Sequence, residues 1–331
     1  MRHRSVAIVG LAKNTGKTEC LNYILRHVKD AGRRVALTSI GIDGESLDQV
    51  SQTPKPEIKV YEDMVFVTSE KHYREKRLIA EVMDISTEQT SLGRLVTARA
   101  VSPGKVLLSG PAKAESARRL IEGMRRHSVD TTIVDGALSR LSIGSPTVTD
   151  AMILATGAAL SCNIPQLTRM TKYVYDRIRL PQVAPELAER LAPIESGVWA
   201  VDKDGEVRDL GIPSIFMAAG HKERLFQYGN TLYVAGVVSD NFMRFLRQQK
   251  NAAELTLVIR DFTKMFATME AYYAYLKKGG RVKVLHSSKL LAVCVNPLAP
   301  NGYRLDSDEL REAIQTSLGV PAYDVRKMDF N

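Results

Sequence analysis

Cysteine, tryptophan and long apolar runs are all scarce in this sequence. Its 331 residues include three cysteines and one tryptophan. The cysteines, Cys20, Cys162 and Cys294, are too few and too widely spaced for a disulfide framework or a zinc site. The longest apolar stretch, residues 151–160, is far shorter than the ~20 residues that cross a bilayer. We therefore expect a cytoplasmic protein with reduced thiols and no membrane partner.

Long runs of one charge are also missing, although the net charge is +9. The basic clusters, such as Arg118-Arg119 and Arg125-Arg126, are short, and no aromatic residues interleave with them. Aromatic platforms and continuous basic stripes are typical of nucleic-acid binding, so we expect no nucleic-acid partner. The six histidines show no metal-ligand spacing. A composition of 44% hydrophobic and 25% charged residues is that of an ordinary globular protein.

The N-terminal segment has the pattern of a strand, a loop, a helix and a second strand. Residues 5–9 form a continuous apolar run rich in β-branched side chains, which is typical of a buried parallel strand. Residues 18–31 carry apolar side chains at helical spacing and are followed by Gly32, a helix stop signal. Residues 35–40 predict the second strand. Together these segments predict a βαβ unit and an α/β fold.

The loop of this unit carries a phosphate-binding motif between Gly10 and Thr18. Gly16 allows the backbone to approach phosphates closely, and the amides of Asn14 and Thr15 and of the helix start face the anion. Lys17 supplies a charge for the β- and γ-phosphates, and the Thr18 hydroxyl is a ligand for Mg²⁺. We expect the nucleotide site to consist of the following residues: Gly10, Lys13, Asn14, Thr15, Gly16, Lys17, Thr18 and Glu19. The motif predicts a P-loop NTPase that binds ATP, although these residues do not distinguish ATP from GTP.

Two aspartates are candidates for the Mg²⁺ site beside Thr18. Asp135 ends the apolar strand of residues 131–135 and is followed by Gly136, which is a Walker-B-like pattern. Asp43 follows the second strand, where a carboxylate can position the metal shell or the attacking water. We therefore expect Thr18, Asp43 and Asp135 as metal ligands, with Lys17 and Asp43 in catalysis. Each aspartate could instead cap a turn.

The spacing of the loop departs from the common P-loop. That motif has four residues between its first glycine and the glycine of the Gly-Lys-Thr triplet, but here Leu11 occupies the first glycine position and Gly10 lies one residue earlier. This longer loop resembles that of dethiobiotin synthetase and other SIMIBI-class P-loop proteins. Some SIMIBI proteins carry a second lysine early in the loop; the matching position here is Ala12, next to Lys13. The class often dimerises, so the resemblance allows a homodimer.

The remaining chain predicts a β-rich insertion and a C-terminal α/β part. Short alternating segments between about residues 53 and 102 predict the insertion after strand two, with one helix near 73–84. Strands and helices then alternate again. A chain of this length exceeds the usual size of one core. We expect a P-loop NTPase domain over residues 1–180 and an α/β domain over 190–331, although the last third could also extend the first sheet. Asn296, after a late strand, could belong to a second site or to a turn.

Beyond the loop, the whole chain resembles a particular P-loop family. Matching stretches are VGLAKNTGKT, LTSIGIDGE, VDGALSR, TDAMILATGA and VNPLAPNGY. They resemble the smaller reactivase subunit that accompanies adenosylcobalamin-dependent lysine 5,6-aminomutase. The resemblance implies that this chain acts with a MutS-like ATPase subunit and uses ATP to release inactive cobalamin from the mutase.

Three functions are compatible with these patterns. The first is an ATPase or ATP-dependent switch that acts on a protein partner. The second is a small-molecule kinase or ATP-dependent ligase of the dethiobiotin synthetase type, in which Lys17 stabilises the transferred phosphoryl group. The third is a nucleotide-binding module with little or no hydrolysis. We favour the first, and no arginine finger is evident except the weak candidate Arg140.

Overall fold

A computed structural model describes residues 3–40, 58–137 and 145–328 of the chain. The described residues divide into two compact units. Unit 1 comprises residues 1–172 and 290–331, and unit 2 comprises residues 173–289. The expected division into 1–180 and 190–331 differs from these units at its C-terminal end, because residues 290–331 belong with the first unit.

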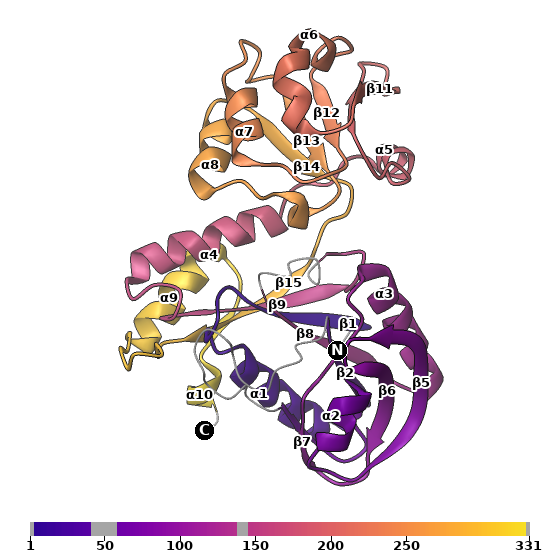
Figure 1. Ribbon diagram of the computed structural model, residues 1–331. Coiled ribbons are helices and arrows are strands. Elements are labelled where there is room, and N and C mark those ends of the chain that lie inside the picture. Colours follow the sequence, from indigo (N-terminus) through magenta and orange to yellow (C-terminus); the bar gives the residue numbers. More distant parts are fainter. Residues whose placement is uncertain (1–2, 41–57, 138–144, 329–331) are drawn as a thin grey trace. The chain divides into compact units, whose positions relative to one another are not determined.

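Unit 1 is built on a large, mostly parallel sheet, shown with its helices in Figure 1. The strand order among the described residues is β16-β15-β9-β1-β8-β2-β4-β6-β5, and only the pairings of β6 with β4 and β5 are antiparallel. Its strands are β1 (Ser5–Gly10), β2 (Val35–Ser39), β4 (Val65–Ser69), β5 (Ala80–Thr90), β6 (Gly93–Ala100), β8 (Thr131–Ala137), β9 (Ala151–Gly157), β15 (Leu290–Asn296) and β16 (Ala322–Tyr323). The predicted α/β fold with a mostly parallel sheet is confirmed.

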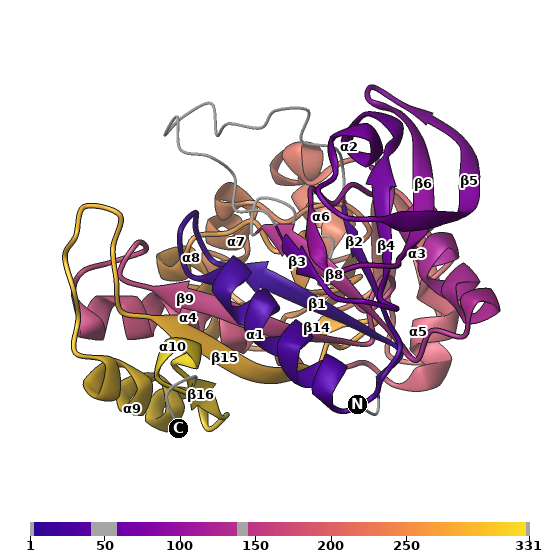
Figure 2. The same cartoon turned by 90° about the horizontal axis from the view of Figure 1, so that it is seen from below.

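The central strands are buried because helices cover both faces of the sheet. Helix α1 (Lys17–Asp30) packs its apolar face against β1 and β9 and also contacts α10 (Val325–Met328), as Figure 2 shows. Its buried side chains join those of β1, β2 and β8 in one hydrophobic cluster. On the other face, a second cluster brings together side chains from β2, β4 and β6 and the end of α3 (Ala114–Gly123). The β1 strand is thus buried throughout, as its apolar run predicts.

The β-rich segment after strand two extends this sheet instead of forming a separate layer. Strands β4, β6 and β5 add to its edge beside β2, and β3 (Ile58–Val60) pairs with β7 (Gly104–Val106) in a small second sheet. The helix predicted near residues 73–84 is wrong: α2 covers Glu70–Glu75, and β5 follows it. The Ser69 hydroxyl caps α2 by accepting from the His72 amide, and pairing with β6 holds the next segment as a strand.

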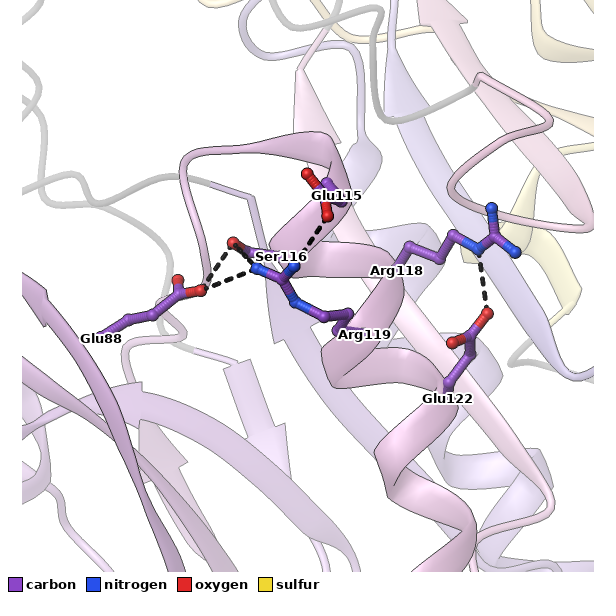
Figure 3. Close-up of polar contacts among 6 residues, drawn as sticks. All are labelled: Glu88, Glu115, Ser116, Arg118, Arg119 and Glu122. Carbon is purple, nitrogen blue, oxygen red and sulfur yellow. Dashed lines mark hydrogen bonds and ion pairs between the residues drawn. The ribbon is translucent and has the colours of Figure 1, made fainter. Parts of the chain in front are cut away.

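At its far end the β5–β6 hairpin is tied to α3 by a small polar network (Figure 3). Arg119 of α3 donates to Glu88 of β5 over 3.2 Å, and Ser116 donates to the same carboxylate over 2.7 Å. Arg119 also pairs with Glu115 in its own helix, while Arg118 pairs with Glu122 of the same helix. The network therefore links two elements that are joined in the chain only through β6 and β7.

Unit 2 has its own five-stranded sheet in the order β11-β10-β12-β13-β14. Strands β12, β13 and β14 are parallel, and β10 and β11 form the hairpin that Asp202-Lys203-Asp204-Gly205 predicts. Its elements are α5 (Pro185–Leu191), β10 (Val198–Val201), β11 (Val207–Ile212), α6 (Lys222–Leu225), β12 (Thr231–Val234), α7 (Asp240–Arg247), β13 (Thr256–Ile259), α8 (Met269–Lys277) and β14 (Arg281–Val284).

Helices α4 (Ile164–Ile178) and α9 (Ser307–Leu318) are the remaining α-helices of the described chain. Helix α4 includes the boundary between the two units, and α9 packs beside β15 and β16 in unit 1. Across the described ranges, no helix has both the length and the apolar character needed to cross a membrane.

Candidate functional site

The predicted phosphate loop connects the buried end of β1 to the start of α1. Two hydrogen bonds fix its shape. The Leu11 amide donates to the Ala155 carbonyl of the neighbouring strand over 2.9 Å, and the buried Thr15 hydroxyl donates to the Ala12 carbonyl over 2.9 Å. The first bond holds the entry of the loop to the sheet, and the second closes the loop on itself. The loop therefore has a defined conformation at the carboxyl edge of the sheet, where ligands bind in open α/β folds.

Two glycines are required by this conformation. Gly16 has φ +85°, a left-handed value that favours glycine, and a Cβ there would lie 2.8 Å from the Cβ of Asn296. At Gly10 a Cβ would lie 2.8 Å from the Thr15 hydroxyl, which makes the bond that closes the loop. Asn14 also has a positive φ, of 60°, which asparagine adopts more readily than most residues. The geometry at these three positions explains why the motif has glycine or asparagine there.

The start of α1 leaves its first amides available to an anion. Gly16 is the N-cap of the 14-residue helix, and it has no side chain that could accept hydrogen bonds from these amides. The intrahelical ladder begins where the Cys20 amide donates to the Gly16 carbonyl over 3.0 Å. The positive end of the helix dipole and uncapped amides together favour a bound anion.

Lys17 and Asp135 face each other across the carboxyl ends of two neighbouring strands. Asp135 lies on β8 in register with Ile8 of β1 and Ser39 of β2, so it stands beside the loop. The Lys17 Nζ lies 2.7 Å from the Asp135 Oδ1, and both side chains are about four-fifths buried. At this distance the ammonium and the carboxylate make a close, charge-assisted contact that uses the Asp135 Oδ1. A carboxylate has further lone pairs with which it can bind a cation.

The other predicted site residues differ from one another in exposure and in contacts. Thr18 is half-buried on the first turn of α1, and Lys13 and Asn14 are exposed on the loop. Glu19 is exposed, and one of its carboxylate oxygens lies 3.8 Å from a guanidinium nitrogen of Arg326 on α10. Asp43, together with Arg140, lies outside the described residues.

Asn296 contacts the loop although its position in the sequence gave little reason to expect it there. Its side-chain amide donates to the Asn14 carbonyl over 3.1 Å, and its Cβ lies beside Gly16. β15 returns to the sheet beside β9 and delivers this residue to the loop from 282 positions away. The only signal in the sequence was a polar residue at the end of an apolar strand.

Other polar residues near strand ends do not join this site. Ser109 is fully buried and its hydroxyl lies 3.0 Å from the Nδ1 of the buried His72. Asp150 accepts from the amides of Arg4 and Ser5 at the start of β1, which is the opposite edge of the sheet from the loop. Within the described ranges, no three histidine, cysteine, aspartate or glutamate side chains are grouped so that they could hold a metal ion.

Comparison with known proteins assigns no family. No protein-family model matches the sequence, and no curated protein matches it. Among solved structures, the chain is similar to pNOB8 ParA bound to nonspecific DNA, with 12% sequence identity and a TM-score of 0.26. The alignment covers 61% of this chain and 64% of the ParA chain, so it spans less than two thirds of ParA.

Proposed function

We propose that the loop from Gly10 to Thr18 binds a nucleoside triphosphate, ATP by expectation, together with Mg²⁺. The observation that supports this most directly is the glycine-dependent loop at the uncapped start of α1, with Lys17 held beside Asp135. A surface turn would require neither the positive φ at Gly16 nor a lysine paired in a partly buried position. Both features suit a site that takes up phosphate.

The described residues fit this ligand. The triphosphate would accept from the backbone amides of residues 14–18, and Lys17 would exchange its carboxylate partner for phosphate oxygens. Asp135 would then be free to hold Mg²⁺ directly or through water, with the Thr18 hydroxyl as a second protein ligand. Mg²⁺ supplies positive charge that offsets the charge on the phosphates. Asn296 would support the loop through the Asn14 carbonyl.

We propose slow nucleotide hydrolysis, with a protein partner as the stimulus. Lys17 would stabilise the charge that develops on the transferred phosphoryl group, and Asp43 would position the attacking water or the metal shell. Water attacks the γ-phosphorus, the bond to the β-phosphate oxygen breaks, and ADP and phosphate leave. Asp135 would act on the metal, and Asp43 would act on the metal shell or on the attacking water.

Replacement of Lys17 tests the site. We expect Lys17→Ala to weaken binding of a fluorescent ATP analogue roughly 10- to 100-fold, because charge-assisted hydrogen bonds to the phosphates are lost. Lys29→Ala is the matched control, since Lys29 is an exposed lysine on the same helix. Equal affinity of Lys17→Ala and the wild type, with both proteins folded by circular dichroism, would contradict the proposal.

The proposed partner is an adenosylcobalamin-dependent aminomutase together with a MutS-like ATPase subunit. This part rests on the sequence resemblance alone. We expect ATP-dependent co-purification of the chain with a lysine 5,6-aminomutase and ATP-dependent release of its cobalamin. A screen in which a small metabolite accelerates ADP release would instead favour a kinase or ligase of the dethiobiotin synthetase type.

A further inference from the structure

Two cysteines that are far apart in the sequence meet in the core of unit 1. The sulfur of Cys20 on α1 lies 2.6 Å from the sulfur of Cys294 on β15, across a separation of 274 residues. Both side chains are buried, Cys20 completely and Cys294 to within 7% exposure, and both are free thiols. The two cysteines are widely spaced in the sequence, but β15 returns to the first sheet and brings Cys294 beside Cys20.

The pair joins the two elements that flank the phosphate loop. Cys20 lies one turn into α1, and its amide donates to the Gly16 carbonyl. Cys294 lies two residues before Asn296, whose side chain donates to the Asn14 carbonyl. A bond between the two sulfurs would therefore connect the start of the helix to the strand that supports the loop from the other side.

We propose that Cys20 and Cys294 form a reversible intramolecular disulfide that ties α1 to β15. The sulfurs are already in contact, so the bond needs only a small local adjustment. With a peroxide as oxidant, one thiolate attacks the peroxide oxygen to give a sulfenic acid and water. The second thiol then attacks the sulfenic sulfur, the disulfide forms, and a second water leaves. Two thiols are oxidised and one peroxide is reduced, and a dithiol reductant reverses the change.

The surroundings of the pair make this oxidation slow in the folded protein. The hydrogen bond with Cys294 and burial both raise the pKa of the Cys20 thiol, so little of the reactive thiolate is present at neutral pH. Oxidation should accelerate as the pH rises, and it should also need local opening. Cys162 is exposed and so is accessible to alkylating reagents in the folded state. A bulky maleimide should therefore label Cys162 first, which allows the buried pair to be followed separately.

The first test is chemical and uses the whole chain. After blocking Cys162 and incubating with hydrogen peroxide, we expect thiol titration in denaturant to find no free thiol, and to find two again after reduction. Peptide mapping without reductant should show the Cys20 peptide linked to the Cys294 peptide within one chain. Two free thiols after oxidation, or sulfinic acid at either cysteine without a linked peptide, would overturn the proposal and leave the pair as two packed apolar side chains.

The second test asks whether the bond ties the helix to the strand. We expect hydrogen–deuterium exchange of the first turns of α1 to slow in the oxidised protein, and its thermal midpoint to rise by roughly 5 °C, since the bond restricts the unfolded chain. Unchanged exchange in α1 after verified oxidation would contradict the proposal that the bond ties α1 to β15.

Three cysteine variants serve as controls. Cys162→Ser should behave like the wild type. In Cys20→Ser and in Cys294→Ser, peroxide should neither slow exchange in α1 nor raise the thermal midpoint. One of these two variants is enough for the test if it folds. Neither test depends on nucleotide binding.

Discussion

At the scale of single residues, two substitutions can separate the effect of the backbone conformation of Gly16 from the effect of its close packing. Gly16→Ala places a side chain at φ +85° and 2.8 Å from the Asn296 Cβ, whereas Gly32→Ala meets a similar φ of +65° with no atom within 4 Å. Both changes should cost about 1–2 kcal/mol in left-handed strain. We expect only Gly16→Ala to lower nucleotide affinity, at least tenfold, because only there must the loop or Asn296 move. Urea unfolding and nucleotide titration of both variants measure the two effects. Equal affinities would show that the loop tolerates a Cβ.

The residues of the site differ in how far the sequence predicts them. The placement of Lys17 and of the glycines follows from local geometry, since one strand, one loop and one helix determine it. Asp135 was predictable because parallel strands end at a common edge. The place of Asn296 beside the loop and the Cys20–Cys294 contact were not predictable. Both depend on which strand of the first sheet β15 pairs with after unit 2.

At the scale of elements, the contacts between β5 and α3 allow a test with a matched pair of arginines. Arg119 binds Glu88 across the two elements, while among the described residues Arg118 pairs within its helix, with Glu122. Because all these side chains are largely exposed, Arg119→Ala should cost at most about 1 kcal/mol, and Arg118→Ala less than about 0.5 kcal/mol. We expect faster hydrogen exchange in β5 for Arg119→Ala alone. Identical exchange in the two variants would mean that the network does not hold the hairpin.

Elements with a strong local pattern are the ones that the sequence predicts. The apolar run of β1 and the helical spacing of α1 give the correct elements to within a residue or two. The segment at residues 73–84 does not, because its alternation is weak and both faces of β5 are largely exposed. Pairing with β6 decides its structure, and that pairing is a tertiary contact.

At the scale of the whole molecule, the two units have separate cores. Leu25 belongs to the main hydrophobic cluster of unit 1 and Leu257 to that of unit 2, and the two clusters share no residue. Both side chains are completely buried, so each leucine-to-alanine change should cost about 2–5 kcal/mol. We expect Leu25→Ala to raise native-state hydrogen exchange chiefly in β1 and β8, and Leu257→Ala chiefly in β12 and β13. If each variant raised exchange equally in both sheets, the chain would unfold as one cooperative unit.

All the described residues of the proposed nucleotide site lie in unit 1, and titration of the 331-residue chain with nucleotide measures binding there. Isothermal titration with non-hydrolysable analogues of ATP and GTP, each with and without Mg²⁺, measures whether the loop takes up a nucleotide and which base it prefers. We expect the ATP analogue to bind at one site per chain, with an affinity that rises when Mg²⁺ is present. No binding of either analogue, with or without Mg²⁺, would contradict the proposed nucleotide site.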